Sequence, residues 1–125
     1  MKSYFLVMAG GAVGAALRFQ LSRLVPVSAD GWPWPTFVAN VAGGLAMGVV
    51  AAWALRHGEA GAPMQLLLGA GLLGGFTTFS AFSLEMVMMI ERGQMILAAS
   101  YAVASVLLAL IALFSGLTLG RGAFA

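Results

Sequence analysis

Four long apolar segments, separated by short polar breaks, dominate this chain of 125 residues. They run from about residue 4 to 25, 36 to 55, 64 to 90 and 95 to 119. A helix that crosses the hydrocarbon core of a bilayer needs about 20 such residues. Trp32, Trp34 and Trp53 fall near the predicted helix ends, as an aromatic belt at the membrane interfaces would. The pattern predicts an all-α membrane protein whose four transmembrane helices form a single domain over residues 1–125.

The scarcity of charge supports a membrane protein. Only 8% of the residues are charged, whereas soluble domains carry about 25%. The net charge of +2 is too small to indicate a nucleic-acid partner, and the absence of cysteine excludes disulfides and thiolate metal sites. We interpret the segment after Lys2 as the first helix and not as a cleaved signal, because its apolar run continues through Leu17.

The third apolar segment has an unusual middle. Glycines at positions 69, 71, 74 and 75 lead into the hydroxyl-rich run FTTFSAFS at residues 76–83. Glycine is unfavourable inside helices, and serine and threonine offer the backbone competing hydrogen bonds. We therefore predict that this helix is broken near its middle. Irregular backbone at membrane depth is tolerated where protein or a polar cavity covers it, and broken helices often build ion sites.

Glycines four residues apart occur in three of the predicted helices. The pairs are Gly10 and Gly14, Gly44 and Gly48, and Gly71 and Gly75. Each pair lies on one helix face and lets another backbone approach closely. We expect a tightly packed bundle.

The basic residues give no preferred orientation in the membrane. If the chain has four spans, three basic residues fall on the side of the two termini: Lys2, Arg56 and Arg121. The other three fall toward the opposite side: Arg18, Arg23 and Arg92. The positive-inside rule then predicts insertion in both directions. Two inverted copies related by a two-fold axis can enclose a pathway that four helices alone cannot. We expect an antiparallel, dual-topology dimer.

The chain offers little for catalysis. Its one histidine, His57, lies in a predicted loop, and no nucleophile–base pair or phosphate-binding loop is recognisable. We do not expect an enzyme.

Polar groups inside the predicted spans are costly and usually functional. Most are hydrogen-bond donors, and the candidates are Arg18, Asn40, Thr78, Ser80, Tyr101 and Ser105. Phe79 and Phe82 share one helix face, and the edges of their rings are electropositive. This set favours a small-anion pathway but does not name the anion. Simpler interpretations stay open: Asn40 as a contact between helices, the phenylalanines as ordinary packing, and Glu85 as a water-exposed residue at a helix end.

Three motifs, in order, resemble those of the CrcB/Fluc fluoride channel family. GGAVGAALRF at residues 10–19 is similar to its GGxxGAxxR(Y/F) signature. TFVAN at residues 36–40 is similar to its second-helix motif, and GGFTTFSAFS at residues 74–83 to its third-helix motif. The resemblance extends over the whole chain and its four spans.

The resemblance implies a fluoride channel in a bacterial inner membrane, built as an antiparallel homodimer with two pores and needing no organic cofactor. Phe79 and Phe82 would line the pore with ring edges, and Asn40 would donate to the ion. Thr78, Ser80, Tyr101 and Ser105 would add hydroxyl groups, while Arg18 and Glu85 would lie in the vestibule. The backbone carbonyls of Gly74 and Thr77, from both chains, would bind a structural sodium ion.

The sequence departs from the family pattern at two positions. Ala81 stands where the family often has Thr, and Ala109 stands where some members have Ser; either change could slow permeation. A paired heterodimer is also possible in this family. The main rival function is a small multidrug-type, proton-coupled cation transporter, but that function needs a carboxylate in the first helix, which is absent here. A non-transporting accessory subunit is a second rival.

Overall fold

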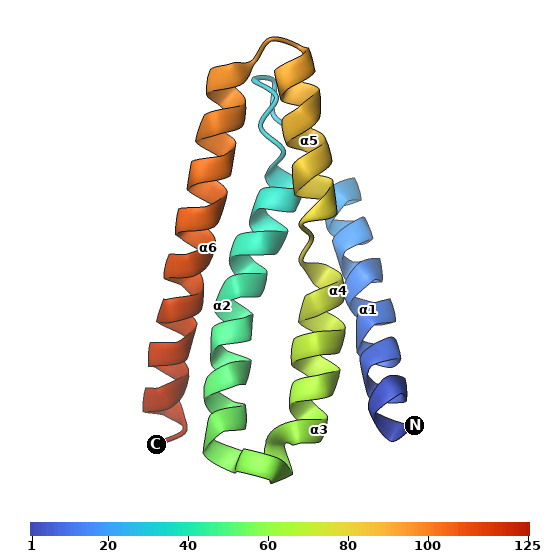
Figure 1. Ribbon diagram of the computed structural model, residues 1–125, viewed down its shortest axis with the longest axis vertical. Coiled ribbons are helices and arrows are strands. Elements are labelled where there is room, and N and C mark those ends of the chain that lie inside the picture. Colours follow the sequence, from blue (N-terminus) through green and yellow to red (C-terminus); the bar gives the residue numbers. More distant parts are fainter.

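The computed structural model describes all residues, 1–125, and consists of helices joined by short loops. The long helices are α1 (Lys2–Leu24), α2 (Trp34–His57) and α6 (Met95–Ala123). Between α2 and α6 lie shorter elements in the following order: the 3₁₀-helical turn η1 (Gly58–Gly61), α3 (Ala62–Met64), the π-helical segment η2 (Gln65–Leu73), α4 (Gly74–Phe76) and α5 (Ser80–Glu91). Figure 1 shows an elongated bundle whose two termini lie at the same end.

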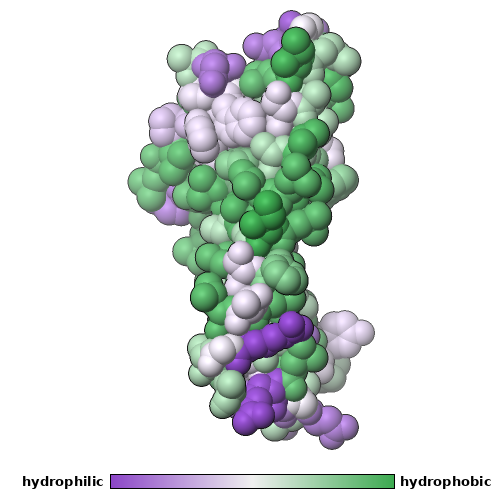
Figure 2. All heavy atoms as spheres, turned by 90° about the vertical axis from the view of Figure 1, so that its left-hand side faces the viewer, coloured by the Kyte–Doolittle hydropathy of each residue, from purple (hydrophilic) through white to green (hydrophobic).

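Three helical runs are long and apolar enough to cross a membrane: Lys2–Leu24, Trp34–Glu91 and Met95–Ala123. The middle run has 58 residues, and Figure 1 shows it turning back on itself between α2 and α3. On the face shown in Figure 2, hydrophilic side chains gather toward the two ends of the long axis, and much of the surface between them is hydrophobic. The chain is therefore an all-α membrane protein.

The helix ends differ in detail from the sequence prediction. The helix expected over residues 36–55 extends from Trp34 to His57. Pro35 lies in its first turn, where a missing N–H costs no helical hydrogen bond. The polar break expected at residues 56–63 is largely helical, because η1 and the first turn of α3 occupy it. Proline is tolerated there for the same reason, at the second residue of α3.

Glycine allows backbone-to-backbone packing along two helix pairs. A Cβ atom built on Gly75 would lie 2.5 Å from the carbonyl oxygen of Gly11, so α4 packs directly on α1. A Cβ atom on Gly44 would lie 2.9 Å from the carbonyl oxygen of Ala109, so α2 packs in the same way on α6. The tight bundle predicted from the glycine pairs is confirmed.

The break in the third segment is confirmed, but it lies after the two glycines and not at them. Gly74 and Gly75 remain helical in α4, and the backbone becomes extended at Thr77 (φ −80°, ψ 157°) before α5 begins at Ser80. Gly75 makes the close contact with α1, and the hydroxyl-rich run supplies the break. The π-helical segment η2 that precedes α4 was not predicted.

Candidate functional site

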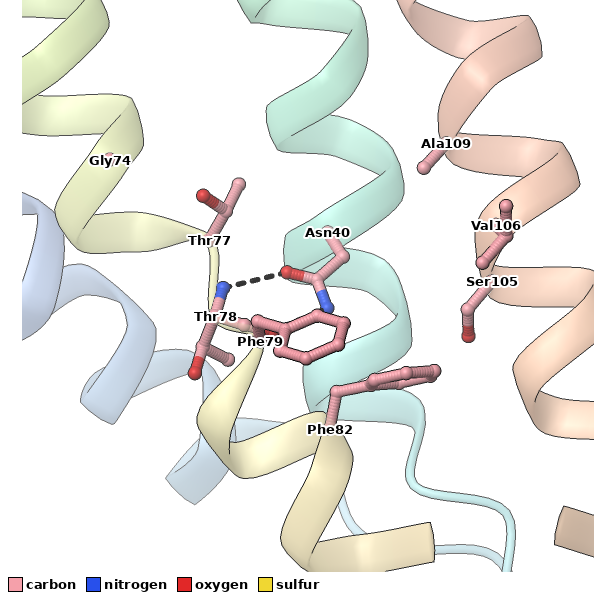
Figure 3. Close-up of a pocket in the computed structure, with 9 residues that line it drawn as sticks. All are labelled: Asn40, Gly74, Thr77, Thr78, Phe79, Phe82, Ser105, Val106 and Ala109. Carbon is pink, nitrogen blue, oxygen red and sulfur yellow. Dashed lines mark hydrogen bonds between the residues drawn. The ribbon is translucent and has the colours of Figure 1, made fainter.

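A groove with a volume of about 420 Å³ lies beside the helix break. It runs between the break, α2 and α6 (Figure 3). Its lining consists of Asn40, Gly74, Thr77, Thr78, Phe79, Phe82, Ser105, Val106 and Ala109. The groove therefore brings together Asn40, Ser105 and five residues around the break that were predicted to form the pore or the sodium site. These five are Gly74, Thr77, Thr78, Phe79 and Phe82.

Asn40 fixes the shape of the break. Its side-chain oxygen accepts a hydrogen bond from the backbone N–H of Thr78 (2.8 Å), and its amide nitrogen donates to the carbonyl oxygen of Thr78 (3.0 Å). A side-chain amide carries two N–H groups, so one remains for another acceptor. Asn40 thus connects α2 to the break and retains one donor at the groove.

The hydrogen bonds around the break release two carbonyl groups. In an unbroken helix the N–H groups of Thr78 and Ala81 would bond to the carbonyls of Gly74 and Thr77. Here the N–H of Thr78 bonds to Asn40 instead, and the N–H of Ala81 bonds to the hydroxyl of Thr78 (3.1 Å). The carbonyls of Gly74 and Thr77 therefore lose their helical partners.

Arg18 lies against the same break. Its Nε donates to the carbonyl oxygen of Gly75 (3.2 Å), and its side chain is partly buried. This places a positive charge at the C-terminal end of α4, where unpaired carbonyls favour a cation. Arg18 does not line the groove.

The two phenylalanines and Ser105 form the rest of the groove wall. The rings of Phe79 and Phe82 are in contact, with centroids 5.7 Å apart, and Figure 3 shows both between the break and α6. Phe82 is 8% exposed, whereas Phe79 is 78% exposed. Ser105 is buried, and its hydroxyl oxygen has no hydrogen-bond partner. Buried polar groups are almost always paired, so this hydroxyl is available to a ligand.

Three other predicted site residues lie outside the groove. Glu85 accepts hydrogen bonds from the hydroxyl groups of Thr36 (2.5 Å) and Tyr101 (2.6 Å), so it joins α5 to α2 and α6. Tyr101 is fully buried and contacts Phe82, with ring centroids 5.1 Å apart. Ser80 is exposed beside the hydroxyl of Thr78.

Sequence reasoning missed three residues of this region. Thr36 carries no signal beyond its place in a motif, although it lies four residues before Asn40, on the same helix face. Val106 lines the groove next to Ser105 and carried no polar signal. Trp32, interpreted as a belt residue, packs instead on Tyr101 with ring centroids 5.4 Å apart.

The sequence model of the family described as "CrcB-like protein, Camphor Resistance (CrcB)" matches residues 5–117. The chain belongs to the CrcB family. Among the curated CrcB relatives, a protein of Phenylobacterium zucineum is 49% identical over 127 residues, covering both chains completely. A protein of Novosphingobium aromaticivorans is 48% identical over 125 residues, which are 98% of each chain. Both relatives are named "Fluoride-specific ion channel FluC".

Family membership agrees with the apolar helices. A CrcB protein with these helices is a multi-pass membrane protein, and the relatives come from bacteria. The names of these relatives describe an ion channel, which is a role other than catalysis.

Proposed function

We propose that this chain forms a fluoride-selective channel that exports fluoride passively from the bacterial cytoplasm across the inner membrane and so confers fluoride resistance. The observation that carries the proposal is the groove, where the unpaired hydroxyl of Ser105 and the spare N–H of Asn40 lie beside the contacting rings of Phe79 and Phe82. Donors and ring edges suit an anion. The names of the relatives supply the identity of the anion.

The proposed assembly is a dual-topology, antiparallel homodimer of four-span subunits with two pores. The middle helical run has 58 residues and turns back on itself, which supports counting it as two spans. Phe79 lines the groove yet is 78% exposed, so one subunit leaves the groove open and a second copy would close it. The equal number of basic residues on the two predicted sides favours two inverted copies over one fixed orientation.

A structural sodium ion fits the break. The released carbonyls of Gly74 and Thr77 are hard oxygen ligands, the type that unwound membrane helices offer to sodium. In the proposed dimer the same two carbonyls of the second copy would complete the set. When bound, the ion would add a fixed positive charge that raises the local potential for anions.

The proposed selectivity for fluoride over chloride follows from two opposing requirements, the removal of the ion's water and the width of the pore. Fluoride is small and strongly hydrated, so the pore must replace its water with close donors, and Asn40 and Ser105 supply such donors from α2 and α6. Larger halides need less compensation but more width, so a narrow, rigid pore rejects chloride on size. No ATP is needed, because a membrane potential drives an anion with about 2.3 kcal/mol per 100 mV.

The structure disfavours the rival cation transporter. Such a protein needs a free carboxylate in its first helix, and α1 contains none. Glu85 is a poor substitute, because both of its oxygens already accept hydrogen bonds from Thr36 and Tyr101.

The test is efflux from liposomes that contain the purified protein and are loaded with fluoride or chloride, with valinomycin and potassium balancing the charge. Rapid fluoride release without chloride release supports the channel. Ser105→Ala should slow the release, whereas Ser100→Ala, which changes an exposed residue on the same helix, should not. No fluoride release from folded, dimeric protein would overturn the proposal.

A further inference from the structure

Two buried side-chain atoms lack a hydrogen-bond partner: the hydroxyl oxygen of Ser105 and the indole nitrogen Nε1 of Trp32. Buried donors are normally paired, and an unpaired one calls for an explanation such as a bound ion. Both residues adjoin Tyr101. Ser105 follows it by one turn on α6, and the ring of Trp32 contacts its ring edge-on, at 75°. Ser105 lines the groove described above, whereas Trp32 does not.

The backbone of Trp32 is fixed by its own loop. Its backbone N–H donates to the carboxylate of Asp30 (3.1 Å), and its carbonyl oxygen accepts from the N–H of Ser28 (3.2 Å). The indole ring also contacts Phe37 edge-on, with centroids 5.4 Å apart. Trp34, two residues later, also contacts this cluster, with its ring centroid 6.0 Å from that of Trp32 and 5.6 Å from that of Phe37, but it is 42% exposed. The indole nitrogen of Trp32 is instead buried.

The neighbourhood of Trp32 contains an obstacle to an anion. The carboxylate of Glu85 lies beside Tyr101 and repels a second negative charge. The hydroxyl groups of Tyr101 and Thr36 are already committed to Glu85. A hydroxyl has one proton to donate, so neither can serve an anion while it holds the carboxylate. The N–H of Trp32 is free of this competition.

We propose that Trp32 is an anion-binding residue of the channel, whose indole N–H donates to fluoride at the loop end of a path that continues from Ser105 past Tyr101. This inference rests on the proposed function. Because Nε1 is buried, the ion reaches it through local movement of the loop over residues 25–33, which contains no helix. The indole offers a donor without introducing a buried charge.

The first experiment compares Trp32→Phe with the control Trp53→Phe in the liposome assay, because Trp53 lies near the far end of α2 and stacks on His57. Phenylalanine keeps an aromatic ring and removes the N–H. Hydrogen bonds to charged groups contribute enough that fluoride release should slow roughly tenfold in Trp32→Phe, while Trp53→Phe keeps the native rate. Benzothienylalanine at position 32 keeps the bicyclic shape without the N–H, so it separates loss of the donor from loss of packing, with the unfolding temperature as the check.

A second readout does not need ion flux. In the Trp34→Phe/Trp53→Phe chain, Trp32 is the sole tryptophan, and its fluorescence should change saturably with fluoride and not with chloride. If the wild-type protein releases no fluoride, the proposed channel function is wrong. The fluorescence titration then tests on its own whether Trp32 binds fluoride. Native flux in both position-32 variants, or fluorescence that fluoride does not alter, overturns the assignment.

Discussion

The side-chain amide of Asn40 forms two hydrogen bonds with the backbone of Thr78, one at its N–H (2.8 Å) and one at its carbonyl (3.0 Å). The amide thereby replaces the helical partners that Thr78 would have in a continuous helix. This pairing explains how an irregular backbone persists in a membrane protein, where unsatisfied peptide groups are costly. Asn40 therefore has a structural role at the break, in addition to the donor role proposed for it in the pore.

Asn40→Ala should destabilise the protein and abolish fluoride release. The N–H and carbonyl of Thr78 lose their partners, which costs about 2 kcal/mol of unfolding free energy. Asn40→Asp keeps the acceptor for the N–H but places a carboxylate against the carbonyl and in the anion path, so it too should stop the flux. The unfolding temperature in detergent and the liposome assay measure the two effects. Native flux in Asn40→Asp would remove Asn40 from the proposed pore.

Gly75→Ala should disrupt the contact between α4 and α1. Its new methyl group would lie 2.5 Å from the carbonyl oxygen of Gly11, and the backbone must move to accept it. Overpacking of this kind typically costs about 1–3 kcal/mol. The matched control is Gly122→Ala, because a Cβ atom on Gly122 meets nothing within 4 Å. Equal unfolding temperatures for the two variants would contradict the proposed role of the glycine contact.

Several features of this fold were predictable from the sequence because they depend on local chemistry. The apolar runs indicated the helices, the glycine pairs indicated close packing, and the hydroxyl-rich run indicated the break. The pairing of Asn40 with Thr78 was not predictable, because it joins residues 38 positions apart. The position of the break was not predictable either: glycine is a poor helix former, yet Gly74 and Gly75 are both helical, and Gly75 packs on α1.

Tertiary contacts also decided the placement of the polar candidates. Glu85 and Tyr101 each suited an open polar pathway when considered alone, but their side chains bond to each other in the fold. Trp32 and Trp34 are both tryptophans near a predicted helix end, so composition could not distinguish them. In the fold, the ring of Trp32 packs on Phe37 and Tyr101 and its indole nitrogen is buried, whereas Trp34 is 42% exposed.

The loop over residues 25–33 should withstand mild acid. The hydroxyl of Ser28 and the N–H of Trp32 donate to Asp30 and hold the pKa of its carboxyl below the usual 3.8. A lowered pKa means that the stabilisation is complete above pH 3.8 and is lost as the pH falls through the lower, folded value. The fluorescence emission of a sole tryptophan at position 32 should stay constant from neutral pH down to the folded-state pKa of Asp30, which lies below 3.8, and should change only as the pH falls through that pKa. Asp30→Asn should abolish this acid transition, and a transition near neutral pH would contradict the assignment.

Ala109→Ser should speed fluoride release. Ala109 lines the groove one turn beyond Ser105, and its methyl group leaves that part of the wall without a donor. A serine hydroxyl there would add a donor, and a hydrogen bond that contributes about 1 kcal/mol corresponds to roughly a fivefold faster rate. Ala104→Ser, on the same helix but outside the groove, is the control and should leave the rate unchanged. A serine on a helix can instead bond to the carbonyl four residues earlier. In that case the groove gains no donor, so an unchanged rate in Ala109→Ser would contradict the prediction that this substitution speeds fluoride release.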